Sequence, residues 1–412
     1  MEKLNKTPAP QPESYQPRTP EIVNMVEQAQ AQTEAQGASG AVSSSGGSGG
    51  SGMIPNMPAL SYEGNNAAYF AQVLDAVLQG LREPSDKARL TAYSGEGNRF
   101  CWTDGAWVFG NECMESLNEA PFETEARVLS ALGWKAKYFT IIRGADGSLE
   151  NTDIARLRQE FTHAIDRGVA VMPAWEHFQP GYTVFFGYED GGRKMIGWDY
   201  QNNIAEPFAW EDWEQKITSY IILQEKDEGK TEREAALDTF AHIVNHARRT
   251  DEVKGRKVGF AAWESFLNAL EHDDFSQCAL LAKRAPTVDH IAQSVEHRFI
   301  IYCDALCQIY ERKNALPYYQ SLAERFPEWR EELNAAIAAL GACASYGGFL
   351  WKHGFSFNKA GYKKFKTPEG RKLLADAGRE AMRKDMEAID CFEAILRKSQ
   401  PGNTPCYNRI SG

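Results

Sequence analysis

The 412-residue chain has few cysteines, no excess of positive charge and no long apolar run, and each absence excludes a class of protein. Eight cysteines are too sparse for a disulfide scaffold, and most fall in helical patterns where a buried thiol acts as a small hydrophobic group. This predicts a reducing, cytoplasmic setting. The net charge of −11 argues against nucleic-acid binding, which needs clustered basic side chains. Without a run of about 20 apolar residues, we expect no membrane span.

Residues 40–52 consist almost entirely of Ser and Gly and carry no charged side chain. Such a segment cannot bury apolar surface, so it behaves as a flexible tether. Its near-repeat GGSGGSG is typical of engineered linkers, and Met53 follows it directly, as the first residue of a second parent would. We therefore predict an engineered fusion, with residues 1–39 as a short passenger and residues 53–412 as the main body.

The passenger begins with a proline-rich stretch, which we expect to be extended. Thr19-Pro20-Glu21 then has the composition of a helix start and predicts a short helix over 20–36. Ile22 and Val26 lie on one face of this helix, with Met25 beside them. Two interpretations remain open: a disordered tail, or a partner or substrate peptide whose apolar face docks on the main body. A tether would raise the local concentration of such a peptide.

Apolar periodicity divides the main body into two parts. Residues 53–225 predict helices first and then an antiparallel sheet, an α+β domain, with a turn-rich segment from Leu90 to Trp102 among the helices. The turn Asp190-Gly191-Gly192 predicts a hairpin between two of its strands. Residues 226–400 are helical throughout, with helices expected over 231–248 and 329–351 among others, and their short polar connections predict a helical bundle. Residues 401–412 form a tail.

Two histidines in the predicted bundle, His242 and His246, are four residues apart and share a helix face. This spacing can bind a metal, but no HExxH glutamate accompanies it. Packing or solvent exposure is the alternative, and we predict neither a metal site nor a cofactor.

Short motifs in the first part carry a resemblance. They are the loop SGEGNR around Ser94 to Arg99, the P-x-W element followed by GYTVFFGYED, and GWDY. In this order they resemble the N-terminal domain of butirosin biosynthesis protein H and its relatives. That family has a papain-like fold akin to bacteriocin-leader peptidases. Gly259, Ala262 and Trp263 resemble a G-x-x-A-W-like helix that follows this domain in the family.

The resemblance implies a cysteine at the start of the first helix, a histidine at the start of a strand, and an Asp or Asn on the next strand. The cysteine position falls at residues 64–66, which hold no thiol. The histidine position falls at Gly181 or Tyr182, and only Asp199 matches the pattern. Thiolate chemistry needs a base within reach of the sulfur, so we expect the protease machinery to be absent.

Another cysteine could replace the missing one. Cys101 lies beside Arg99, whose charge would favour a thiolate, and His177 lies just ahead of the GY strand. A catalytic pair of Cys101 and His177 therefore stands against a packed, structural Cys101, whose neighbours alternate with it as in a core. Either way, we expect a cleft lined by aromatic and charged side chains. The predicted ligand-binding residues are Arg99, Trp102, Trp175, Glu176 and Tyr188.

The sequence thus predicts a papain-like protein without the protease dyad, which binds a peptide or small-molecule ligand. The fused segment 1–39 would be its tethered partner or substrate. The alternative is an acyltransferase or peptide-modifying enzyme with Cys101 as nucleophile and Tyr182 or His177 as acid or base. The resemblance would make its donor an acyl-carrier protein. A third hypothesis, a regulatory sensor, lacks any recognisable DNA-binding element.

Overall fold

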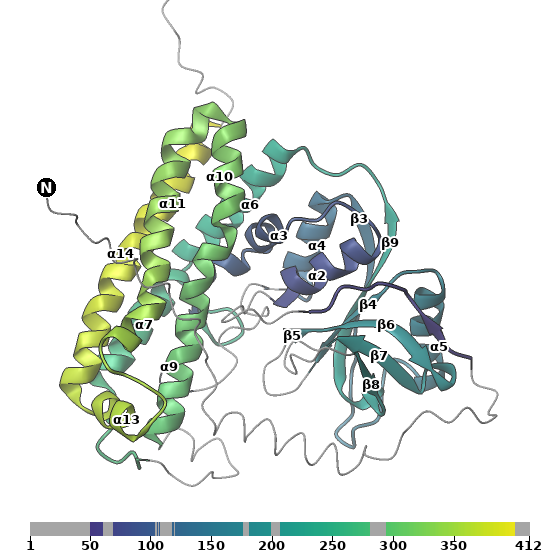
Figure 1. Cartoon of the computed structure of the whole chain (residues 1–412), viewed down its shortest axis with the longest axis horizontal. Coiled ribbons are helices and arrows are strands. Elements are labelled where there is room, and N and C mark those ends of the chain that lie inside the picture. The colour runs from purple at the N-terminus through teal and green to yellow at the C-terminus, as the bar shows by residue number, and fades with distance from the viewer. Residues whose placement is uncertain are drawn as a thin grey trace, which may run out of the picture.

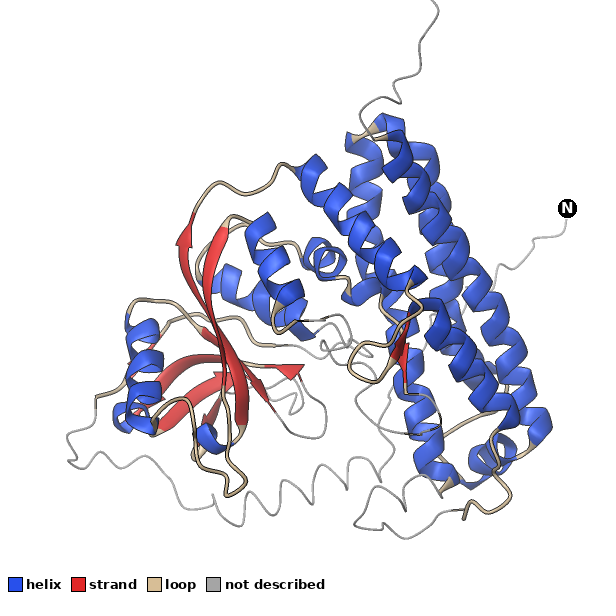
Figure 2. Cartoon of the chain, turned by 180° about the vertical axis from the view of Figure 1, so that it is seen from behind, coloured by secondary structure: helices blue, strands red, loops and turns tan. Residues whose placement is uncertain are grey.

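The computed structural model describes residues 50–60, 69–103, 105, 107, 118, 120–175, 181–198, 207–280 and 294–399. Within these residues the chain is a mixture of helix and antiparallel sheet, followed by a set of long helices (Figure 1). Seen from behind, the sheet lies on one side and the long helices on the other, with shorter helices between them (Figure 2).

The main sheet has eight strands, six of them in the order β3-β9-β4-β6-β7-β8. Their bounds are β3 Trp134–Thr140, β9 Ile217–Lys226, β4 Val171–Trp175, β6 Val184–Glu189, β7 Lys194–Trp198 and β8 Phe208–Trp210. Two short strands complete it: β1 (Gly52–Met53) pairs with β6, and β5 (Gly181–Tyr182) pairs with β4. The predicted hairpin is confirmed, because Glu189 pairs with Lys194 across Asp190-Gly191-Gly192. All three turn residues have positive φ, which glycine adopts without strain.

Four helices lie among the described residues of this first part: α2 Tyr69–Gly80, α3 Lys87–Ser94, α4 Glu123–Ala131 and α5 Ile154–Asp166. The sequence predicted a turn-rich segment from Leu90 onward, and the structure instead continues α3 through Ser94. Asp86 caps this helix by accepting hydrogen bonds from the amides of Ala88 and Arg89. Gly95 ends it in the left-handed conformation, with φ of 75°.

The end of the predicted linker is part of the sheet. Gly52 pairs with Tyr188, the Gly50 carbonyl accepts a hydrogen bond from Gly191 at 2.8 Å, and Ile54 donates to Phe186 at 2.8 Å. A side chain at Gly52 would place its Cβ 2.7 Å from the Tyr188 ring. Residues 50–52, which the sequence assigns to the flexible tether, instead lie along the side of β6. Their backbone groups form hydrogen bonds there with groups that would otherwise lack partners.

The long helices form the predicted bundle region. Their bounds are α6 Glu232–Arg248, α7 Gly259–His272, α9 Val295–Tyr310, α10 Leu316–Arg325, α11 Arg330–Ala344, α12 Phe349–Lys352, α13 Lys359–Lys366 and α14 Pro368–Lys398. A capping box at Thr231 and Glu234 starts α6. The sequence predicted one helix over 329–351. In the structure, a 3₁₀ segment over Ser345–Gly348 separates α11 from α12, at a pair of glycines that disfavour a continuous helix.

One helical run of the described residues, Pro327–Lys352, is long and apolar enough to cross a membrane by length and composition alone. Its residues Leu333, Ala336 and Leu340 are buried in the bundle core, where α11 packs along α14. A core helix of a bundle has the same composition.

The apolar core runs across the predicted boundary at 225/226. One cluster contains Leu74 of α2 and Ile221 of β9 together with Phe240 of α6, Tyr319 of α10 and Phe392 of α14. A separate domain would have its own core. The boundary therefore marks the change from sheet to long helices, while the packing is continuous across it.

Candidate functional site

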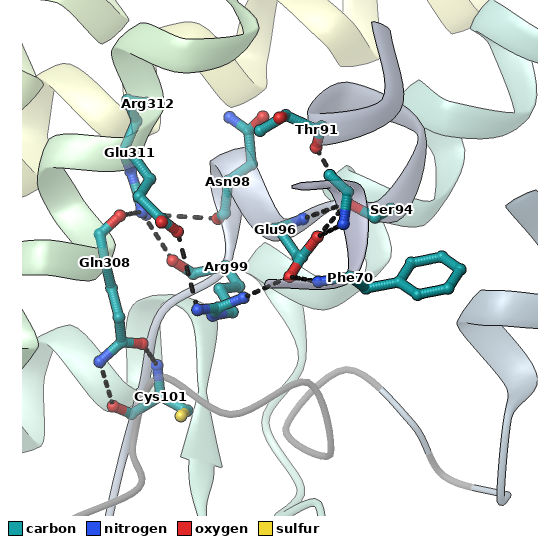
Figure 3. Close-up of polar contacts among 11 residues, drawn as sticks. Phe70, Thr91, Ser94, Glu96, Asn98, Arg99, Cys101, Gln308, Glu311 and Arg312 are labelled. Carbon is teal, nitrogen blue, oxygen red and sulfur yellow. Dashed lines mark hydrogen bonds and ion pairs between the residues drawn. The ribbon is translucent and has the colours of Figure 1, made fainter. Parts of the chain in front are cut away.

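A buried polar network lies where the first part meets the long helices (Figure 3). At its centre is Arg99, which the sequence predicted as a ligand-binding residue and which is fully buried. Its guanidinium lies 3.5 Å from the Glu96 carboxylate and 3.6 Å from that of Glu311. Buried charges persist only when paired in this way. Among the described residues, Arg99 therefore contacts other buried groups of the protein itself.

A second buried arginine extends the network into the bundle. Arg312 donates to the Arg99 carbonyl at 2.6 Å and to the Asn98 carbonyl at 3.2 Å. It also pairs with Asp385 of α14, at 2.8 Å. Asn98 in turn accepts a hydrogen bond from the Tyr319 hydroxyl at 2.6 Å. These contacts fix the loop after α3 against α10 and α14.

Glu96 lies at the first turn of α2. Its carboxylate accepts hydrogen bonds from the amides of Phe70 at 3.1 Å and Ala71 at 2.9 Å, and from the Ser94 hydroxyl at 3.0 Å. An anion is favourable there because the amino end of a helix carries partial positive charge. Burial nevertheless raises the pKa of Glu96, and the charge of Arg99 and the helix amides oppose this only in part.

A second buried carboxylate, Glu125 of α4, faces the same region. It accepts a hydrogen bond from the Tyr182 hydroxyl at 2.7 Å and one from the Asn118 amide at 2.8 Å. Burial raises the pKa of Glu125, and the nearby charge of Glu96 raises it further. The Phe70 ring lies 5.3 Å from the Tyr182 ring, centroid to centroid. Glu96 and Glu125 therefore flank the contact between the start of α2 and strand β5.

The sequence interpretation missed these carboxylates. Glu96 lies inside the SGEGNR motif, and the motif could have drawn attention to it. Glu125 lies in the first turn of an ordinary amphipathic helix and carried no signal. Buried carboxylates with raised pKa values are a common feature of functional sites.

Cys101 and Trp102 form the short strand β2, which pairs with β10 (Lys257–Val258). Both residues are fully buried. The Cys101 amide donates to the Gln308 side chain at 3.0 Å, and the cysteine packs in a small cluster with Val253 and Val258. The Trp102 ring packs edge-on against Phe266, with centroids 5.1 Å apart. These surroundings favour a structural Cys101 over a nucleophile, and place Trp102 in the core.

Tyr188 is not near Tyr182. The two lie six residues apart along extended backbone, which corresponds to about 20 Å. The Tyr188 hydroxyl donates to Asp166 at the end of α5, at 2.8 Å, and this hydrogen bond raises the pKa of Tyr188. The structure therefore does not bring together all the aromatic residues predicted to line one cleft.

Several predicted residues lie outside the described residues: Ile22, Met25, Val26, the stretch 64–66, Glu176, His177 and Asp199. Trp175 is described only through its backbone, at the end of β4. Their described neighbours in sequence nevertheless meet. Phe70 contacts Tyr182, and the Thr183 hydroxyl donates to the Trp198 carbonyl. The Trp198 indole donates to the Met57 carbonyl at 3.4 Å.

The two histidines of α6 have no metal-binding partners among the described residues, where no group of three or more His, Cys, Asp or Glu side chains could hold a metal. His246 is buried and lies near the backbone of Phe100. Burial lowers the pKa of His246 to about 3, and the charge of Arg312 lowers it further. His246 is therefore neutral at physiological pH.

The described site thus combines two buried carboxylates, a tyrosine hydroxyl and aromatic rings at the start of α2. It can hold polar groups and protons, and the residues from 53 to 100 contain no thiol. No protein-family model and no curated protein sequence matches this chain.

Proposed function

We propose that the chain is a papain-like protein without the protease dyad, which binds a peptide or small-molecule ligand. Residues 1–39 would be its tethered partner or substrate peptide. The observation that carries this proposal is the position of Glu96, whose carboxylate takes the amides of Phe70 and Ala71 at the amino end of α2.

The amino end of a helix lowers the pKa of a cysteine placed there and so favours its thiolate. In this chain a buried carboxylate occupies that end. A neighbouring negative charge would raise the pKa of any thiol at the position and disfavour the thiolate. Residues 53–100 contain no cysteine, which is consistent with a carboxylate at this helix end. The negative charge would inactivate a cysteine nucleophile, but it does no harm where there is none.

The position that corresponds to the histidine supports the same conclusion. The Tyr182 hydroxyl donates a hydrogen bond to the Glu125 carboxylate. While this hydrogen bond is present, the hydroxyl cannot act as a base that takes a proton from a nucleophile. The pair instead fixes the orientation of the tyrosine ring next to Phe70. Aromatic walls with a few fixed polar groups are typical of sites that bind rather than transform a ligand.

Cleavage of the Gly/Ser segment tests the proposal in the full chain. A protease site inserted among residues 40–49 would separate the passenger from the body without changing either. We expect residues 1–39 to co-elute with the body in gel filtration after cleavage. Separate elution of the passenger would show that it is not a ligand.

The contact can be assigned to the predicted helix with charge-matched variants. Ile22→Asp with Val26→Asp places two charges on the apolar face, and we expect it to release the cleaved passenger. Asn24→Asp with Gln28→Asp adds the same charge to the opposite face and should leave the complex intact. Equal release in both variants would indicate that the apolar face makes no specific contact.

A further inference from the structure

One end of the helical bundle carries a local excess of positive charge, although the chain is acidic. Residues 333–368 contain five lysines and no aspartate or glutamate, although the chain as a whole carries a net charge of −11. They include α12 and α13, and α13 lies at the lower end of the bundle in Figure 1. Three of the lysines, Lys352, Lys359 and Lys363, are exposed.

These three lysines differ from most cations on the long helices. None of them has an acidic partner within 4.0 Å among the described residues. On the neighbouring α14, by contrast, Lys372 pairs with Asp376 at 3.1 Å, and Arg383 pairs with Glu387, both at the favourable spacing of four residues. Charge pairing is thus the rule on the adjacent helix and is missing from α13.

The arrangement is unfavourable for α13 itself. Lys359 occupies the first position of the helix, where a cation meets the positive end of the helix dipole. It also lies four residues before Lys363, a spacing at which like charges repel. The dipole accounts for Lys363 in the last turn, but it disfavours Lys359. The stability of the helix therefore does not explain why a lysine occupies this position.

The helix is held rigidly despite this repulsion. Asn358 caps it by accepting hydrogen bonds from Ala360 and Gly361, each at 3.0 Å. On its inner face Tyr362 and Phe365 are buried against Phe299, with ring centroids 5.8 Å and 5.1 Å apart. The outer face therefore presents its lysines at a fixed spacing, which lowers the entropy that a partner must offset on binding.

We propose that Lys352, Lys359 and Lys363 form a docking face for an acidic segment of a protein partner. A few cations at fixed spacing suit carboxylates on a helix or loop. A nucleic acid would need a wider basic surface and would be repelled by the net charge. Stable binding to an anionic membrane relies on four to eight clustered basic residues or an apolar anchor. This proposal is independent of the proposed ligand site near Glu125.

Binding of a fluorescein-labelled poly-glutamate peptide to the full chain, followed by fluorescence anisotropy, tests this proposal. We expect binding at low ionic strength that weakens as NaCl is raised from about 0.02 M to about 0.3 M, because salt screens exposed charges. The variant Lys359→Glu with Lys363→Glu should bind about tenfold more weakly. Circular dichroism checks that it remains folded: a glutamate at the first position of α13 favours the helix, and one in the last turn disfavours it by a similar amount.

The matched control is Lys87→Glu with Lys254→Glu, which changes two lysines outside α13 that also have no acidic partner among the described residues. Both double variants lower the net charge by four, from −11 to −15. Equal weakening in the two variants, or no peptide binding by the unaltered chain, would overturn the proposal. So would preferential binding to phosphatidylserine vesicles, which would assign the face to a membrane.

Discussion

The guanidinium of Arg312 lies 2.8 Å from the carboxylate of Asp385, and both groups are buried. Arg312 precedes α10, and Asp385 lies in the middle of α14. Arg312 also donates to the backbone of Asn98 and Arg99 in the first part of the chain. Asp385 accepts a further hydrogen bond from the Trp263 indole at 3.0 Å. This single ion pair therefore joins four segments that are far apart in the sequence.

Replacement of Asp385 by asparagine should destabilise the whole fold. It removes the charge that compensates Arg312 and leaves a buried cation, which typically costs about 3–5 kcal/mol. Urea unfolding followed by circular dichroism measures this change. Asp390→Asn on the same helix is the control, because its pair with Arg248 is exposed and should contribute about 1 kcal/mol or less. Similar losses in the two variants would contradict the role assigned to the buried pair.

The neutral state of His246 predicts a loss of stability in acid. Its pKa is about 3 in the folded protein and about 6.5 when unfolded, so the unfolded chain binds the extra proton between these values. Stability should therefore fall as the pH decreases below about 6.5. The expected loss from this residue between pH 7.5 and pH 5 is about 2 kcal/mol.

Glu96 and Glu125 oppose this trend, because their pKa values are raised in the fold and acidification relieves their buried charge. The contribution of His246 is therefore isolated by comparing variants. His246→Gln should reduce the loss of stability on acidification, measured by urea unfolding at the two pH values. The same His-to-Gln change at the exposed His272 controls for the substitution itself. An unchanged loss in His246→Gln would show that this histidine does not titrate as described.

The packing of Gly52 predicts that the end of the Gly/Ser segment contributes to the sheet. A Cβ at Gly52 would lie 2.7 Å from the Tyr188 ring and 2.8 Å from the Asp166 carboxylate. Gly52→Val should therefore destabilise the fold by about 1–3 kcal/mol, the usual range for overpacking, as measured by thermal unfolding. At Gly50 a Cβ meets open space, so Gly50→Val should be close to neutral. Equal effects would support a free tether through residue 52.

The sequence predicted those elements whose signals are local. The turn Asp190-Gly191-Gly192 carries its own conformational preference, and α6 starts at a capping box that is visible in the sequence. The helix α3 was missed because its apolar residues keep no clear helical period and its buried residues follow one another from Leu90 to Ser94. All sides of α3 are buried because it packs against α10 and α6. A local sequence pattern carries no information about such distant neighbours.

The candidate site was predicted less well, for the same physical reason. The sequence around Arg99 suggests a ligand-binding arginine. Its environment, however, is set by Glu311 and by Arg312, which is 213 residues away. Whether a charged side chain faces solvent or another buried charge depends on such long-range pairs. Tyr182 was identified from its motif, and its partner Glu125 became apparent only from the fold.

The burial of Cys101 predicts that it does not react as a catalytic thiol. Its residue is fully buried, and Gln308 holds its backbone through the amide at 3.0 Å. In the native chain at neutral pH, iodoacetamide should leave Cys101 unmodified, as shown by mass spectrometry of its tryptic peptide. The same peptide should be alkylated once the chain is unfolded in urea, which controls for detection.

Cys307 gives an internal comparison, because it lies on α9 and is only half-buried. We expect Cys307 to be alkylated before Cys101, since reaction requires access to the thiolate. Faster labelling of Cys101 than of Cys307 in the native chain would reveal an accessible, activated thiol. That result would favour the acyltransferase hypothesis over a protein that only binds its ligand, because a nucleophile must reach its substrate.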